Sequence, residues 1–98
     1  MTLRQIQRLI ERGEYEMSEK VRTFIEEGLF EEDDLVECVL TATRIYKTEQ
    51  DDRQESVDRQ KYVLLGRDTR GRPFYTAGKV CTDAVGRFYF YITAHPAD

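Results

Sequence analysis

The residues that could take part in acid–base or phosphate chemistry gather in the C-terminal half of this chain. His95 is the only histidine, and a histidine can transfer a proton near neutral pH. Tyr75 and Lys79 are separated by an even number of residues on one predicted strand, so their side chains should share one face of the sheet. We expect His95 on the neighbouring strand to lie on that same face. A tyrosine can stack on an unpaired base, and a cation can neutralise a phosphate. These three are the candidate catalytic residues for a reaction such as RNA cleavage, which needs proton transfer and charge stabilisation at phosphorus.

Basic residues around these candidates could bind phosphate. Residues 59–87 carry seven Lys and Arg against two Asp, a local balance of +5 within a chain of net charge −4. Local charge sets the field that an anionic ligand meets. The same residue types are also ordinary in charged hairpin tips and in half-buried sheet surfaces. The candidate RNA- and phosphate-binding residues are Arg67, Arg70, Arg72, Arg87 and Tyr91, of which Tyr91 would position a base.

The sequence holds no general catalytic or metal-binding signature. It has no phosphate-binding G-x-x-x-x-G-K loop, no nucleophile elbow and no His/Cys spacing typical of a metal site, so we predict no metal and no cofactor. Cys38 and Cys81 lie far apart within apolar stretches, and we expect them to be buried, reduced thiols. The carboxylates of residues 31–34 favour the start of a helix over a cation site.

Hydrophobic periodicity predicts three helices in the first half of the chain, residues 2–42. Residues 2–12 have apolar side chains at helical spacing, and Gly13 follows the last of them. Ser18 is a suitable N-cap for the second helix. The third helix is expected to begin at the carboxylates of residues 31–34.

From residue 43 to residue 95 the period is that of strands, which are predicted at 43–48, 62–65, 72–81 and 87–94. The polar stretch 49–60 is predicted to be a mobile loop, because it offers little apolar area to offset the entropy of ordering. In the last strand, alternation predicts that Phe88, Phe90, Ile92 and Ala94 face the helices and that Tyr89, Tyr91 and His95 face outward. The predicted fold is a single α+β domain over residues 1–98, with three N-terminal helices packed on a four-stranded antiparallel sheet.

The beginning of the chain shows no targeting pattern. Met1 is followed by a polar, charged segment, and no stretch approaches the roughly 20 apolar residues that span a bilayer. The hydrophobic fraction of 40% is too high for a disordered segment. We therefore expect a folded cytoplasmic protein with no membrane partner.

Short motifs along nearly the whole chain carry a family resemblance. They are Leu3-Arg4-Gln5-Ile6, Ser18-Glu19-Lys20, Leu64-Leu65-Gly66, Gly71-Arg72-Pro73 and Tyr91-Ile92-Thr93-Ala94. In order and spacing they resemble domain-of-unknown-function family 4258, which is thought to be similar to the RelE/ParE-like toxins of toxin–antitoxin modules. Several of those toxins cleave ribosome-bound messenger RNA. The resemblance implies a RelE/ParE-like fold, an activity directed at RNA and an antitoxin as a protein partner.

The chain departs from the family pattern at several places, one of which is His95, where the family usually has a tyrosine after Ile-Thr-Ala. Lys20 stands where the family commonly has a histidine, and Phe74 and Tyr75 follow Gly-Arg-Pro where the family often has an apolar residue and a histidine. Two functions stay open. One is an RNA-directed protein, ribonuclease-like or degenerate; the other is a non-catalytic protein-interaction module that binds a protein partner or a second copy of itself. Lys20 and the acidic total favour the second.

Overall fold

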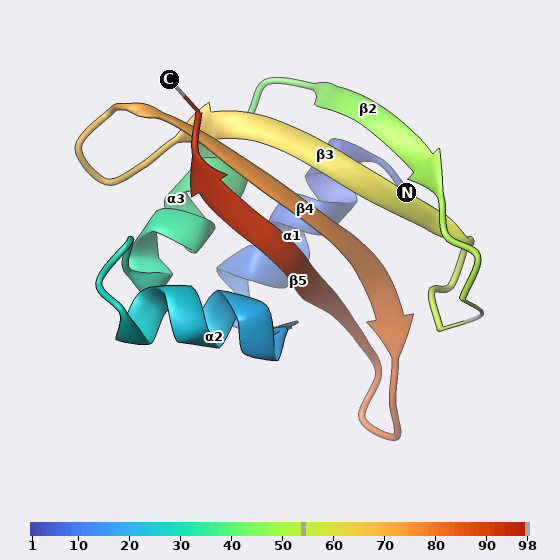
Figure 1. Cartoon of the computed structure of the whole chain (residues 1–98). Coiled ribbons are helices and arrows are strands. Elements are labelled where there is room, and N and C mark those ends of the chain that lie inside the picture. Colours follow the sequence, from blue (N-terminus) through green and yellow to red (C-terminus); the bar gives the residue numbers. More distant parts are fainter. Residues whose placement is uncertain (54, 98) are drawn as a thin grey trace.

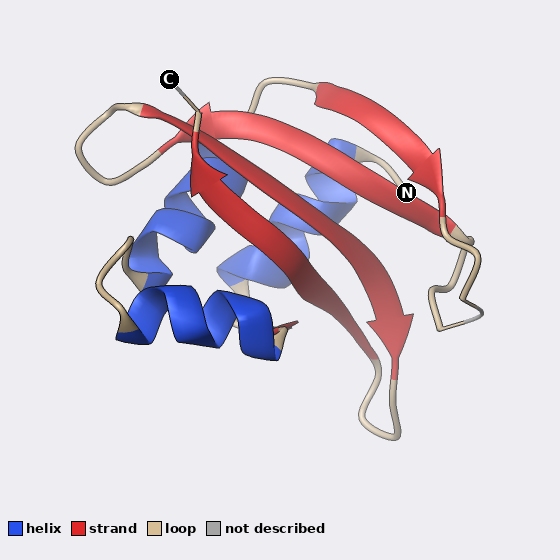
Figure 2. Cartoon of the chain, in the orientation of Figure 1, coloured by secondary structure: helices blue, strands red, loops and turns tan. Residues whose placement is uncertain are grey.

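A five-stranded mixed sheet carries three helices on one of its faces in the computed structural model, which describes residues 1–53 and 55–97 (Figures 1 and 2). The strand order is β1-β5-β4-β3-β2. The elements are α1 (Leu3–Glu11), β1 (Tyr15–Met17), α2 (Glu19–Glu26), α3 (Glu32–Thr41), β2 (Ile45–Gln50), β3 (Gln60–Arg67), β4 (Pro73–Thr82) and β5 (Arg87–Pro96). The expected four-stranded antiparallel sheet of RelE/ParE type is wrong, because β1 adds a fifth strand that runs parallel to β5.

Local capping explains where the helices begin. The side chain of Thr2 accepts a hydrogen bond from the Gln5 amide, and the Thr2 amide donates to the Gln5 side chain, which closes a capping box at α1. Ser18 accepts from the amide of Val21 at the start of α2. At α3, Asp34 accepts a hydrogen bond from the amide of Glu31. Three helices therefore form close to the predicted ranges.

The short strand β1 was not predicted from the sequence. The Tyr89 amide donates to the carbonyl of Glu14, and the Ser18 amide donates to the carbonyl of Tyr91. The three residues of β1 are too few to show an alternating pattern, and their partner strand lies more than 70 residues further along the chain. Only this long-range pairing makes the segment a strand.

A β-bulge reverses the facing of side chains along β5. Gly78 pairs with Tyr91 but Ala77 pairs with Thr93, so Ile92 is an extra residue on β5. Tyr91 before the bulge and Ala94 after it are both fully buried on the helix side. The expected inward position of Ala94 is therefore confirmed, and so is the outward position of His95, which is exposed.

Before the bulge, the predicted facing of β5 is wrong. Tyr89 and Tyr91 pack in the core and not on the outer face. Phe88 and Phe90, expected to face the helices, are half-buried on the opposite side. Aromatic side chains stand at both even and odd positions of this strand, so alternation could not show which set faces the helices.

Two glycines allow close approaches between layers. A Cβ added to Gly66 would lie 2.0 Å from the carbonyl oxygen of Cys38, which shows that α3 packs directly on the backbone of β3. A Cβ added to Gly78 would lie 2.4 Å from the ring of Tyr89. Gly66 follows the predicted end of its strand at residue 65 and instead lies within β3. The two glycines set the spacing of the core.

The connection between β2 and β3 lies against β4. The amide of Val57 donates to the carbonyl of Val80, and Ser56 forms an isolated bridge with Cys81. Residues 49, 50 and 60, expected within the loop, belong to strands, and residue 54 lies outside the described residues. The mobility of the loop stays a prediction.

Both cysteines are free and buried, as expected, and their chemistry can be tested. Burial raises the pKa of the Cys38 thiol to about 11 and also raises the pKa of Cys81. A thiol reagent at neutral pH should therefore label both residues much more slowly in the native protein than in denaturant. Rapid labelling of Cys38, which is fully buried, would contradict its packing between α3 and the sheet.

Candidate functional site

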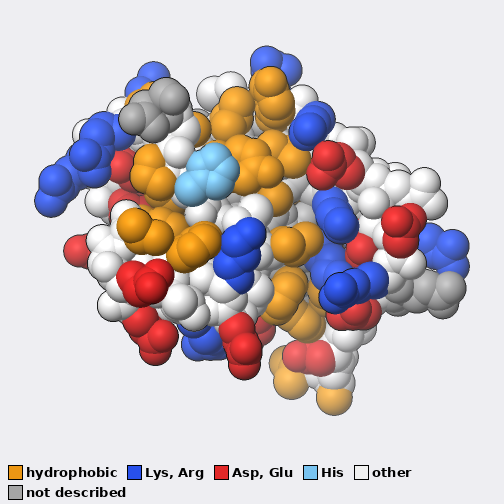
Figure 3. Space-filling model, viewed as in Figure 1, with side chains coloured by type: hydrophobic (Ala, Val, Ile, Leu, Met, Phe, Trp, Pro, Cys, Tyr) orange, Lys and Arg blue, Asp and Glu red, His pale blue; other side chains and the backbone are white. Residues whose placement is uncertain are grey.

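Tyr75 and His95 form a stacked pair on the sheet face opposite the helices. The antiparallel register of β4 and β5 places them directly across from each other, with ring centroids 4.4 Å apart and an angle of 15° between the rings. His95 is exposed and Tyr75 is half-buried. In Figure 3 the pale blue side chain is His95, the only histidine, and hydrophobic side chains gather beside it. The structure thus brings together two of the three predicted catalytic residues.

Phe88 and Phe90 lie on the same face, further along β5, and sequence reasoning missed them. We call Tyr75, His95, Phe88 and Phe90 the aromatic face. Phe90 pairs across the strands with Lys79, four residues from Tyr75, so it lies about 13 Å from the stacked pair at the rise of a strand. Phe88 pairs with Cys81, six residues from Tyr75, and lies about 20 Å from the pair.

Lys79 is on the outer side of β4 but is not a free cation. Its Nζ lies 3.3 Å from Asp51 Oδ2 and 3.9 Å from Glu55 Oε2, and the side chains of Lys79 and Asp51 are 6% and 1% exposed. Burial alone would raise the pKa of Asp51, but hydrogen bonds from the Arg53 amide and from Lys79 lower it. Lys79 therefore neutralises a buried carboxylate and presents no free cation at the surface of the sheet.

Tyr91 is also unsuited to its predicted role. Its hydroxyl donates a hydrogen bond to the carbonyl oxygen of Leu35 at 3.0 Å, and its ring packs edge-on against Tyr15 and Tyr89. Burial raises the pKa of the hydroxyl above its usual value. Tyr91 joins α3 to the sheet and cannot position a base at the surface.

The predicted phosphate-binding arginines separate into three places. Arg67 ends β3 beside the Tyr75 end of the sheet, and its guanidinium donates to the carbonyl of Gly71. Arg70 and Arg72 line a groove on the helix side of the hairpin. Arg87 begins β5, eight residues from His95 and so about 25 Å away, and it contacts the sulfur of Met1. Of the five predicted residues, only Arg67 lies close to the stacked pair.

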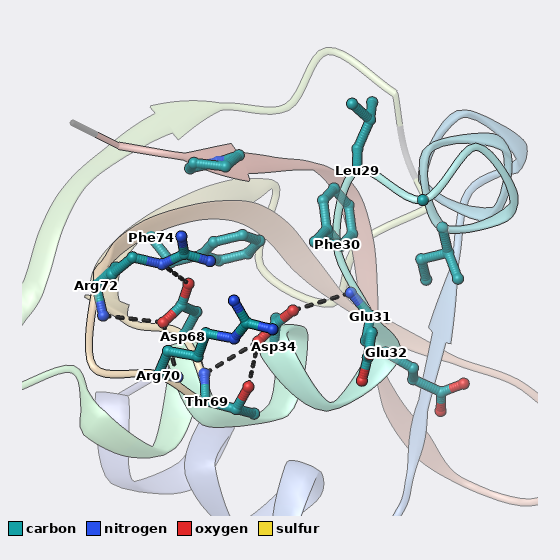
Figure 4. Close-up of a pocket in the computed structure, with 13 residues that line it drawn as sticks. Leu29, Phe30, Glu31, Glu32, Asp34, Asp68, Thr69, Arg70, Arg72 and Phe74 are labelled. Atoms are coloured by element: carbon teal, nitrogen blue, oxygen red, sulfur yellow. Dashed lines mark hydrogen bonds and ion pairs between the residues drawn. The ribbon is translucent and has the colours of Figure 1, made fainter.

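The groove has a volume of about 700 Å³ (Figure 4). It lies between the α2–α3 connection, the start of α3 and the β3–β4 hairpin. Phe30 and Phe74 form an apolar floor, with ring centroids 5.3 Å apart. The groove is lined by Ile25, Gly28, Leu29, Phe30, Glu31, Glu32, Asp34, Asp68, Thr69, Arg70, Arg72, Phe74 and Pro96.

Two carboxylates fix the β3–β4 hairpin: Asp34 joins it to α3, and Asp68 closes its turn. Asp34 Oδ1 accepts hydrogen bonds from the amide and the hydroxyl of Thr69, at 3.0 and 2.9 Å. Burial would raise the pKa of Asp34, but these hydrogen bonds and the one from the Glu31 amide lower it. Asp68 accepts from the amides of Arg70 and Arg72 and from the Arg72 Nε. Both carboxylates are internally satisfied and have a structural role.

Residues 1–53 and 55–97 contain no group of three or more His, Cys, Asp or Glu side chains that could hold a metal ion. No helix in these ranges is long and apolar enough to cross a bilayer. No protein-family model, curated protein or solved structure matches the chain. The resemblance to family 4258, and with it an antitoxin partner, stays a prediction.

Proposed function

We propose that the aromatic face binds single-stranded RNA and that the protein is a binding module without ribonuclease activity. The stacked pair of Tyr75 and His95 on the helix-free side of the sheet carries this proposal. Bases stack on aromatic side chains, and sheets with exposed aromatic residues are one of the common surfaces for unpaired RNA. Phe90 offers a second stacking position on the same face.

The small residues between these positions leave room for a strand of RNA. Ala77 and Thr93 pair across β4 and β5 and separate the stacked pair from Phe90. Arg67 lies at one end of β3 and Lys61 near the other, at alternating positions that share the outer face. These two cations can neutralise phosphates beside the stacked bases. Lys79 cannot contribute, because Asp51 already neutralises it.

The same geometry argues against cleavage. Cleavage needs a proton-transfer group together with charge stabilisation at phosphorus. His95 can transfer a proton, and its Nδ1 lies 2.9 Å from the carbonyl oxygen of Pro96. The lysine expected beside it is buried in an ion pair about 13 Å along the strand. The surface therefore retains the groups for binding and lacks the expected cation for catalysis.

Fluorescence anisotropy with a labelled single-stranded RNA tests the proposal. Tyr75→Ala or His95→Ala should weaken binding about tenfold or more, because stacking contributes about 1–3 kcal/mol per base. Tyr75→Phe keeps the ring and should bind within about twofold of the wild type. Lys61→Ala and Arg67→Ala should each reduce the salt slope by about 0.7, the value per phosphate for single strands.

The matched charge control is the double variant Arg4→Ala, Arg8→Ala on α1, which is exposed on the helical side and should change little. An equal loss in this control would move the binding site away from the aromatic face. No RNA binding at low salt, where the electrostatic contribution is largest, would overturn the proposal and leave the protein-interaction module. Cleavage that depends on His95 would show that the protein is an active ribonuclease.

A further inference from the structure

The groove beside the β3–β4 hairpin has walls of opposite charge. Arg70 and Arg72 project from the hairpin on one side, and Glu31 and Glu32 stand at the start of α3 on the other (Figure 4). Leu29, at the mouth of the groove, is 58% exposed. A contact surface typically has an apolar centre and a polar rim, and an exposed apolar side chain beside charged walls fits that pattern.

Hydrogen-bonding groups on these walls are available to a partner, although Asp68 already neutralises the charge of Arg72. Among the described residues, the guanidinium of Arg70 has no hydrogen-bond or ion-pair partner, and Arg72 uses only its Nε to bind Asp68. Glu32 accepts one hydrogen bond, from the hydroxyl of Tyr15, and retains further acceptor positions. The groove therefore presents free donors on one wall and free acceptors on the other.

We propose that the groove is the contact surface of a weak symmetric dimer of this chain. Under a two-fold axis the same patch meets itself, so it must be complementary to itself. Here the basic wall of each copy would face the acidic wall of the other. Leu29 of each copy would enter the other's apolar floor. A ligand of one charge sign would instead be repelled by one of the two walls, so the observations favour a second copy over an acidic or a basic partner.

The dimer and the RNA-binding proposal use different surfaces. The aromatic face lies on the outer side of β4 and β5, whereas Phe74 and Pro96, which line the groove, point to the helix side. Dimerisation would leave Tyr75 and His95 accessible. The two proposals can therefore fail independently.

Charge reversal in two separate variants tests the dimer. Sedimentation velocity over a concentration series should show the wild type passing from monomer to dimer. Glu31→Lys and Arg70→Glu should each raise the dimer dissociation constant at least tenfold, because each sets like charges against each other in both symmetric contacts. An equimolar mixture of the two variants should recover the dimer, since every reversed wall then meets a wall of opposite sign. Leu29→Glu should prevent association both as a single variant and when it is added to each charge variant of the mixture.

Arg8→Glu on α1 is the matched control; it should dimerise like the wild type and should not restore association when mixed with Glu31→Lys. Far-UV circular dichroism and thermal melts must show that each variant is folded. Where a variant is unfolded, Glu32→Gln or Arg70→Gln takes its place. Each of these should weaken association several-fold. A wild type that stays monomeric at the highest concentration would overturn the proposal. So would dimers that persist in both charge variants, or a mixture that fails to recover the dimer.

Discussion

Replacing Gly66 with alanine should destabilise the protein by at least about 3 kcal/mol, near the upper end of the usual cost of overpacking. The added Cβ would lie 2.0 Å from the carbonyl oxygen of Cys38 and 2.8 Å from its carbonyl carbon. Both are backbone atoms of α3, so no side-chain rotation can relieve the clash. The helix must move away from β3, and the Cys38 contacts with the carbonyls of Leu64 and Phe74 would be lost with it.

The measurement is urea or thermal unfolding, and Gly71→Ala is the matched control. Gly71 has φ +79° but no atom within 4 Å of the added Cβ, so only its backbone conformation is penalised, by about 1 kcal/mol. At this chain length each kcal/mol lowers the melting temperature by roughly 4–8 °C. Equal losses in the two variants would show that α3 does not pack on β3 as closely as the structure indicates.

Replacing Lys79 with methionine should cost about 3–5 kcal/mol, because it leaves Asp51 buried without its cation. The double variant Lys79→Met, Asp51→Asn should recover much of this loss. It removes both charges, and the asparagine can still accept the hydrogen bond from the Arg53 amide. Lys47→Met is the exposed control. Its ion pair with Glu49 joins side chains that are 55% and 53% exposed, so the loss should stay below about 1 kcal/mol.

The pH dependence of Lys79→Met separates the lost ion pair from a general packing defect. In the wild type the pKa of Asp51 is lowered, so its contribution is complete above the ordinary carboxyl pKa near 4 and is lost as the pH falls below that value. Without Lys79, burial should raise the pKa of Asp51, so protonation stabilises the variant as the pH falls. The difference between the two proteins should therefore be largest at neutral pH and should narrow in acid. A difference that is independent of pH would exclude the ion pair as its cause.

The stacked pair is the part of the candidate site that sequence reasoning found. Alternation along β4 and β5 placed Tyr75 and His95 on the outer face, and the register confirms that they are neighbours. The same alternation assigned the wrong faces to the first half of β5, where Tyr89 and Tyr91 are buried. The bulge at Ile92 reverses the alternation, so the predicted outward position of His95 is correct.

Lys79 shows why the rest of the site could not be predicted. Its spacing from Tyr75 placed it on the correct face, but its partner Asp51 is 28 residues away in a polar stretch with no periodic pattern. Whether a lysine is free or neutralised depends on which loop folds over it. The groove could not be predicted for the same reason, because Arg70 and Glu31 come from segments that only packing brings together.

The sequence by itself determined the helices, because capping residues such as Thr2 and Ser18 and the apolar spacing act within a few residues of each other. It also determined four of the five strand segments, because alternation is a local property. The tertiary structure alone decided that residues 15–17 form a fifth strand, which face of β5 meets the helices and which charges remain free. The physical reason is that alternation separates two faces without saying which is buried. That choice belongs to contacts between residues far apart in the chain.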